Sequence, residues 1–144
     1  MKEITSKLNQ LLASLQVYYQ NLRGFHWNIE GRDFFQLHEK FEELYDEAAE
    51  TIDGIAERIK ILNGTPFHTF SDYLEHSSVK PAANVSNGDE AVRLTLSASE
   101  TILSQLNQTM EAAQKGSDEG TASMISGLIE SMEKQIWMLK AYLK

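Results

Sequence analysis

The chain has 144 residues, of which 42% are apolar, and this is enough for one domain with a sizeable core. A formal charge of −8 argues against the broad basic surface that nucleic-acid binding needs. Cysteine is absent, which excludes disulfides, thiolate metal sites and thiol nucleophiles. No apolar run is long enough to cross a bilayer, and the N-terminus lacks the apolar segment of an export signal. We therefore expect a cytoplasmic protein without a membrane partner.

The first predicted helix lies at the N-terminus. Apolar side chains recur there at steps of three or four, which is the spacing of one helical face. The pattern ends where Gly31 interrupts it. The residues expected to face inward are Ile4, Leu8, Leu11, Leu12, Leu15, Tyr18, Leu22, Phe25 and Ile29.

The second predicted helix begins at Asp33. Asp33 is followed three residues later by Gln36, which is a variant of the capping box. The stretch Asn63-Gly64-Thr65-Pro66 ends the helix, because a glycine followed closely by proline stops helical structure. The residues expected to face inward are Leu37, Phe41, Leu44, Ala48, Ile52, Ile55, Ile59 and Leu62.

A long connection over residues 65–87 follows, and its TFSDYLEH stretch is predicted as a short helix. Asn87 and Glu90 form a capping box for the third helix, and Gly116-Ser117 separates it from the fourth. The expected inward residues of these two helices are Val92, Thr95, Leu96, Ser99, Leu103, Leu106, Met110, Ile125, Leu128, Met132, Ile136, Leu139 and Leu143. No segment has strand periodicity. Residues 1–144 are therefore expected to form one all-α domain, a four-helix bundle with the long crossover between helices 2 and 3 of ferritin-like folds.

Four residues of the first two helices have the side chains of a metal site: His26, His38, Asp53 and Glu57. Asp53 and Glu57 are four residues apart, so they project from the same face of a helix. Two imidazoles and two carboxylates suit Fe(II), which accepts mixed nitrogen and oxygen ligands. On spacing alone a second interpretation stays open, in which the carboxylates are a solvated helix face and the histidines are packed polar residues.

Within one chain, His38 and Asp53 cannot bind the same ion. Fifteen residues of helix separate them by about 22 Å, whereas bonds from metal to nitrogen or oxygen are about 2 Å long. If a second copy packs antiparallel through a twofold axis, His38 of one chain can approach Asp53 and Glu57 of the other. Twofold contacts are the commonest oligomeric arrangement, and they form every such site in duplicate.

The stretches HWNIEG, LHEKFEELY and IDGIAERI together resemble the Dps family, the DNA-binding proteins from starved cells or miniferritins. The resemblance covers essentially the whole chain, and the spacing of the four candidate ligands matches the family's ferroxidase ligands. It implies a hollow homododecamer with intersubunit di-iron ferroxidase centres at its twofold interfaces. Such an enzyme oxidises Fe(II), with hydrogen peroxide in preference to oxygen, stores ferric mineral and protects against oxidative damage.

The resemblance also assigns roles around the centre. Glu57 is expected to bridge or anchor iron, Asp53 and His38 to complete the first site, and His26 to help hold a second metal. Trp27 is expected to pack near the centre. There it either donates an electron to an over-oxidised intermediate or is simply a partly buried core aromatic.

Four further acidic residues are candidates for supporting roles. Glu42 and Asp46 either orient ligands and pass ions or are solvated. Asp118 and Glu119 lie at the start of the predicted fourth helix, which in related cages lies near a threefold pore. They are therefore expected either to line an iron path into the shell or to complement the positive end of the helix dipole.

Two functions of other classes stay open: a DNA-binding, nucleoid-compacting protein, as the family name suggests, and a structural bundle without catalysis. DNA binding is expected to be weak, because sequence-independent binding depends on lysine and arginine neutralising phosphates. The helical pattern already begins by Ile4 and continues to Leu143, which leaves almost no basic tail.

Overall fold

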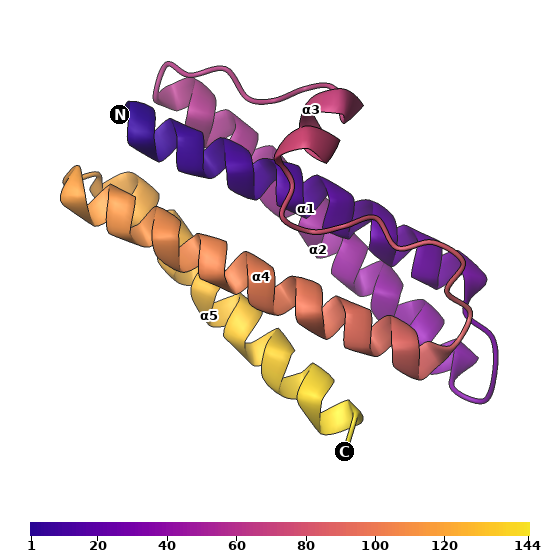
Figure 1. Ribbon diagram of the computed structural model, residues 1–144. Helices are drawn as coiled ribbons and strands as arrows, with labels where there is room; N and C mark the ends of the chain where they lie inside the picture. The colour runs from indigo at the N-terminus through magenta and orange to yellow at the C-terminus, as the bar shows by residue number, and fades with distance from the viewer.

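The structure, a computed structural model, describes residues 1–144 and contains five α-helices and no β-strand. The helices are α1 (Lys2–Asn28), α2 (Phe34–Ile61), α3 (Phe70–His76), α4 (Gly88–Lys115) and α5 (Glu119–Tyr142). α1 and α2 form one antiparallel hairpin, α4 and α5 form another, and the crossover brings the chain back so that α2 and α4 run in the same direction (Figure 1). The predicted all-α bundle is confirmed, and α3 is the short helix predicted for TFSDYLEH. None of the helices has the length and apolar content that spanning a membrane requires.

The core lies between the four long helices and is built from the predicted apolar stripes. Every predicted inward residue of α1, from Ile4 to Ile29, is buried. In α4, Ile102 is fully buried although the predicted stripe omits it, whereas Leu103, which was predicted to face inward, is only partly buried and lies outside the core. Each large apolar side chain removed from water in this way stabilises the fold by roughly 1.5–3 kcal/mol before entropy is counted. Burial of these stripes is therefore what holds the two hairpins together.

The end of α2 follows from its last residues. Asn63 has a φ of 63°, and its N–H donates to the carbonyl of Lys60 at 2.9 Å. The N–H of Gly64 donates to the carbonyl of Ile59 at 2.8 Å. These two bonds form the Schellman arrangement, which satisfies carbonyls that would otherwise lack a partner at the end of a helix. The predicted stop at Asn63-Gly64 is confirmed.

One predicted helix cap is present and another is not. Asn87 Oδ1 accepts a 2.9 Å hydrogen bond from the N–H of Glu90, as expected for the start of α4. The predicted capping box of Asp33 and Gln36 is wrong, because the Asp33 side chain makes no cap hydrogen bond. Its carboxylate instead accepts a 3.0 Å hydrogen bond from the hydroxyl of Tyr142 at the far end of the chain. A tertiary contact has replaced the local one.

Side chains of α1 fasten the long crossover to the bundle. Asn9 donates to the carbonyl of Thr65 at 3.0 Å and accepts from the N–H of Phe67 at 2.8 Å. Asn21 makes the same pair of bonds with the backbone of residues 80–82, at 3.0 and 2.9 Å. These bonds satisfy backbone groups of an irregular segment that has no ladder of its own. The crossover is therefore held along α1 at both of its ends.

Candidate metal centre

His26 and His38 meet where the first hairpin turns. His26 is on the last turn of α1 and is buried, whereas His38 is near the start of α2 and is partly buried. Their imidazole rings stack, with centroids 3.7 Å apart and planes inclined by 11°. The two histidines that the sequence places twelve residues apart therefore form one pair in space.

Each imidazole is held by the backbone of the other residue. Nδ1 of His26 lies 2.6 Å from the carbonyl oxygen of His38, and Nδ1 of His38 lies 2.7 Å from the carbonyl oxygen of His26. Because a carbonyl oxygen only accepts hydrogen bonds, each Nδ1 carries the proton. In the neutral imidazole this leaves a lone pair on Nε2, which is the atom that then binds a metal. Both rings are thus held in a tautomer suited to metal binding.

Three neighbours surround the histidine pair. Oε1 of Glu42 is 3.7 Å from Nε2 of His26, so the chain itself brings one carboxylate to this pair. The ring of Tyr45 meets His26 edge-on at 5.3 Å, and Phe34 stacks on His38 at 4.9 Å. Tyr45 is not among the residues predicted for this site. It follows His38 by seven residues, or two turns of the same helix, and this spacing places both on one face.

Trp27 is more exposed than a core aromatic. Its side chain is 56% exposed, although it follows the buried His26 directly. The Arg23 guanidinium lies over its ring, 5.0 Å from the centroid. Within one chain, therefore, Trp27 is not the partly buried core residue that was one of its two expected roles. Its indole is on the surface, with the Arg23 guanidinium as its neighbour.

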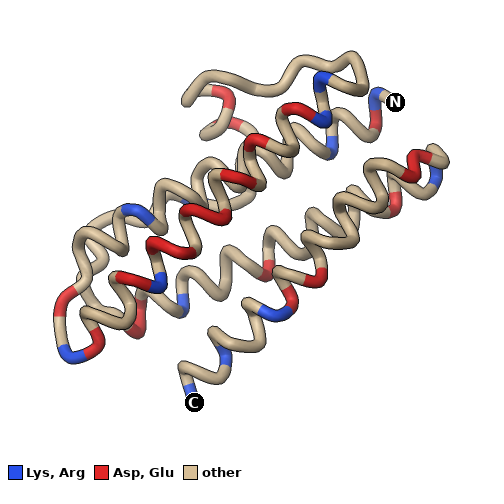
Figure 2. The backbone as a smooth tube through the Cα atoms, turned by 180° about the vertical axis from the view of Figure 1, so that it is seen from behind, with Lys and Arg blue, Asp and Glu red and all other residues tan.

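Asp53 and Glu57 lie apart from the histidines, toward the other end of α2. Both are exposed, and no ion pair within the chain involves either of them. Asp46, between the two groups, is exposed as well. Acidic residues recur along much of α2 in Figure 2. No three His, Asp or Glu side chains of one chain converge to hold a metal ion.

Asp118 and Glu119 differ in their surroundings. Asp118 is the N-cap of α5 and accepts from the N–H of Thr121 at 3.0 Å, from its hydroxyl at 2.6 Å and from Arg58 Nη2 at 2.8 Å. Burial opposes ionisation of Asp118, but the bonds from Thr121 and the Arg58 guanidinium outweigh it and hold the carboxyl's pKa below its ordinary value. Glu119 is exposed. Of the two acids, Asp118 is the one that caps the helix.

The ligand types suit divalent iron, but one chain does not collect enough of them. The histidine pair offers two Nε2 atoms and the nearby Glu42 carboxylate, a mixed nitrogen and oxygen set of the kind that Fe(II) accepts. Asp53 and Glu57 offer two more carboxylates at the other end of the same helix. Within one chain, therefore, neither end of α2 presents a complete set of metal ligands.

Comparison with known proteins gives the family. A family model described as a ferritin-like domain matches residues 5–144. The chain is 42% identical over 142 residues to DNA protection during starvation protein 2 of Bacillus anthracis, which covers 99% of this chain and 97% of that protein. It is 45% identical over 139 residues to an uncharacterized protein of Haemophilus influenzae, covering 96% of this chain and 87% of that protein.

Solved structures agree with the relatives. The Dps protein of Vibrio cholerae O1, described as a member of a broad superfamily of ferritin-like diiron-carboxylate proteins, matches with a TM-score of 0.98 and 40% identity, over 99% of this chain and 90% of that chain. Dps of Staphylococcus aureus matches with a TM-score of 0.97 and 38% identity, over 100% of this chain and 97% of that chain. The predicted resemblance is confirmed, and the chain belongs to the Dps family of ferritin-like proteins.

Proposed function

We propose that this protein is a cytoplasmic ferroxidase that oxidises Fe(II) and stores the ferric product inside a hollow homododecamer. The single observation that carries the proposal is the histidine pair. His26 and His38 lock each other's rings through Nδ1 and leave both Nε2 atoms for a metal, in a chain that brings only one carboxylate near them. Membership of a family that includes a diiron-carboxylate protein supports the same chemistry.

The missing ligands come from a second copy in this proposal. If two chains pack antiparallel across a twofold axis, the histidine pair of each chain faces Asp53 and Glu57 of the other. The exposure of both carboxylates supports this arrangement, because a ligand that must serve another chain cannot be buried in its own. Each dimer then has two identical iron sites, and six dimers make the shell that the family resemblance implies.

Iron is the substrate of this reaction. Each Fe(II) gives up one electron, and hydrogen peroxide takes two electrons and two protons as its O–O bond breaks, which yields two waters. Glu57 anchors the iron, Asp53 and His38 complete the first position, and His26 helps to hold the second ion. The negative carboxylates favour the more highly charged ferric product. Reduction of peroxide by two electrons in one place avoids release of hydroxyl radical.

A mixed oligomer tests the shared site. One chain carries His26→Ala and His38→Ala, and the other carries Asp53→Ala and Glu57→Ala. Either double variant alone lacks a complete site, whereas a mixed dimer has one site with all four ligands. Random mixing should therefore restore about a quarter of the sites, because half of the twofold dimers are mixed and each has one intact site of two. The initial rate of Fe(II) oxidation by peroxide, followed by absorbance, measures the recovery.

Mixing itself must be verified, for example with tags of different mass on the two chains. Absence of any recovery in a verified mixed oligomer would sink the shared-site model. Substituting dissolved oxygen for peroxide in the same assay tests the proposed oxidant. Faster turnover with oxygen would contradict the preference for peroxide.

For the path of iron into the shell, Glu119 is the stronger of the two proposed residues. Its carboxylate is exposed, whereas that of Asp118 is bound by Arg58 and Thr121. An acidic opening concentrates cations electrostatically, and the effect weakens with salt. Glu119→Gln is expected to slow iron uptake at low ionic strength more than at high ionic strength. Stopped-flow absorbance at two salt concentrations checks this, and unchanged uptake at low salt would remove Glu119 from the path.

A further inference from the structure

Arg58, which follows the proposed ligand Glu57 directly, does not point into solvent. Its Nη2 donates to Asp118 Oδ1 at 2.8 Å and its Nε donates to Thr121 Oγ1 at 2.9 Å. The side chains of Arg58 and Asp118 are only 21% and 11% exposed. We call Arg58, Asp118 and Thr121 the Arg58 clamp. It joins the C-terminal turns of α2 to the first turn of α5.

The far side of the clamp is itself rigidly held. The N–H of Asp118 donates to the carbonyl of Ala113 at 2.8 Å, while Ser117 adopts a φ of 55°. These features end α4 in the Schellman arrangement, as at the end of α2. Asp118 therefore closes α4 with its backbone, caps α5 with its carboxylate and binds Arg58 with the same carboxylate. The clamp fixes α2 to the corner between α4 and α5.

Gly120 leaves the space that the guanidinium occupies. A Cβ atom at position 120 would lie 2.6 Å from Arg58 Nη2 and 3.1 Å from its Cζ. The backbone there does not have the positive φ that would demand glycine. A side chain at this position would therefore require the Arg58 guanidinium to move away from α5.

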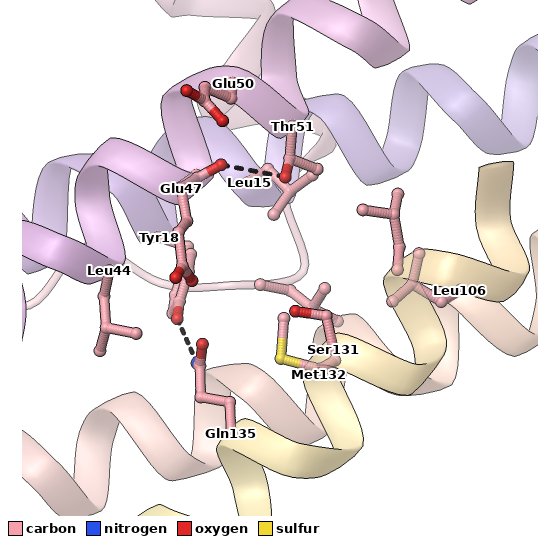
Figure 3. Close-up of a pocket in the computed structure, with 13 residues that line it drawn as sticks. Leu15, Tyr18, Leu44, Glu47, Glu50, Thr51, Leu106, Ser131, Met132 and Gln135 are labelled. Carbon is pink, nitrogen blue, oxygen red and sulfur yellow. Dashed lines mark hydrogen bonds between the residues drawn. The ribbon is translucent and has the colours of Figure 1, made fainter.

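Between its two ends, α2 is not fully packed against α5. A pocket of about 200 Å³ opens between them, lined on one side by Glu47 and Thr51 and on the other by Met132 and Gln135 (Figure 3). Polar ties between these helices are found at their ends. One is the Arg58 clamp, and the other is the bond from the Tyr142 hydroxyl to Asp33. These two polar contacts at the ends of α2 therefore help to fix its position.

We propose that Arg58 is a positioning residue for the metal centre. The centre needs the histidines at one end of α2 and the carboxylates at the other end to meet a second chain at the same time. The Arg58 clamp holds the carboxylate end of α2 in place and thereby sets where Asp53 and Glu57 arrive at the partner's histidine pair. This inference rests on the proposed function. Arg58 itself is not a ligand, since it is a cation with its donors engaged by Asp118 and Thr121.

Two variants disturb the clamp in different ways. Arg58→Ala removes the guanidinium, and Gly120→Ala pushes it away with a Cβ atom while leaving every charge in place. Gly120→Ala also improves the helix propensity of α5, so it does not weaken that helix. Arg58→Lys keeps the charge but loses the planar fork that binds two partners, and it should give an intermediate effect. Thr121→Val replaces Arg58→Ala should the latter fail to fold.

The measurement is anaerobic titration of the full oligomer with Co(II), whose visible absorbance reports ligand geometry, together with initial rates over a range of Fe(II) concentrations. Loss of a group that hydrogen-bonds a metal ligand weakens metal binding by about 10- to 100-fold. Arg58 acts on the ligands only through the position of α2, so its loss should have a smaller effect than that range allows at most. For Arg58→Ala and Gly120→Ala we expect roughly tenfold weaker Co(II) binding, which is the lower end of the range for a direct partner. The Fe(II) concentration at half-maximal rate should rise by a similar factor. The maximal rate should change less than the half-saturating concentration.

Glu100→Gln is the matched control, because it removes another ion pair, with Lys140 at 3.9 Å, on the exposed surface of the bundle. It should leave Co(II) binding and its spectrum unchanged. Arg58→Ala and Gly120→Ala could instead lower the melting temperature while Co(II) affinity and spectrum stay like those of the unmodified protein. The clamp would then be purely structural, and the positioning role would be disproved while the proposed function still stood. If the unmodified oligomer neither binds Co(II) nor oxidises Fe(II), the proposed function fails and the positioning role falls with it.

Discussion

The stacked imidazoles of His26 and His38 each use Nδ1 on the other residue's carbonyl, so neither ring can turn without breaking a bond between α1 and α2. This arrangement has two consequences at the scale of single residues. It connects the two helices of the first hairpin at their turn, and it keeps both Nε2 atoms available to a metal. Glu57 has no comparable task in its own chain, since it is exposed.

Glu57→Ala or His38→Ala is expected to slow Fe(II) oxidation more than the ~10- to 100-fold that follows loss of a group hydrogen-bonded to a ligand, because here the proposed ligand itself is lost. The oligomer should survive, since the buried core is untouched. Initial oxidation rates and the mass from size-exclusion chromatography check the two statements. Glu43→Ala, which removes another exposed carboxylate of α2, is the control and should oxidise iron normally. Normal rates for Glu57→Ala would contradict the ligand assignment.

The lowered pKa of the Asp118 carboxyl leads us to expect that the stability of the fold depends on pH. Its folded-state pKa lies below the ordinary value of 3.8, because the bonds from Thr121 and Arg58 outweigh the effect of burial. The stability that this carboxylate contributes is therefore fully present above pH 3.8 and is lost as the pH falls through the lower folded pKa. Asp118→Asn should destabilise the fold by about 1.5–3 kcal/mol near neutral pH, as expected for a lost hydrogen bond between charged groups. Thermal unfolding from pH 7 to pH 2.5 should show the difference shrinking below ~pH 3.8, and a constant difference would disprove the argument.

At the scale of elements, polar side chains of α1 determine the course of the long crossover. Asn9 and Asn21 each exchange two hydrogen bonds with its backbone, and Ser14 accepts a 2.9 Å bond from the N–H of Ser78 between them. The crossover carries α3, which buries none of its own residues. Its position therefore depends on these bonds more than on its own packing.

Asn21→Ala is expected to destabilise the fold by about 1–3 kcal/mol, because two backbone groups of the crossover lose their partner. Thermal unfolding measures the loss, and hydrogen exchange should show faster exchange at the N–H of Ala82. Asn28→Ala is a matched control, because Asn28 bonds only the carbonyl of Gly24 in its own helix. If the two variants were equally stable, the crossover would not depend on Asn21.

At the scale of the whole molecule, the net charge argues against a function that requires a broad basic surface. The formal charge is −8 for each chain, and acidic residues follow much of the length of α2 (Figure 2). An assembly of such chains repels the phosphate backbone at long range. The same charge attracts Fe(II), so it favours the proposed iron chemistry over DNA compaction.

We expect no stable complex with DNA at physiological salt, although relatives are named DNA protection during starvation proteins. Nonspecific binding depends on lysine and arginine contacts to phosphate, and the chain has 13 such residues against 21 acidic ones. A gel shift with linear duplex at about 0.15 M salt, without divalent metal, is the test. A retarded complex at submicromolar protein would show that the surface holds a basic cluster strong enough to overcome the net charge.

The sequence by itself determined the helices, most of their buried residues and the types of candidate ligand. Helical periodicity is a local property, so Leu8 or Ile55 could be assigned to the core from its neighbours alone. Family motifs likewise depend only on residue type and spacing. The tertiary structure alone decided which polar groups meet. Asp118 binds Arg58 sixty residues away, and Asp33 binds Tyr142 instead of capping α2, because the packing of helices brings together side chains that no local pattern relates.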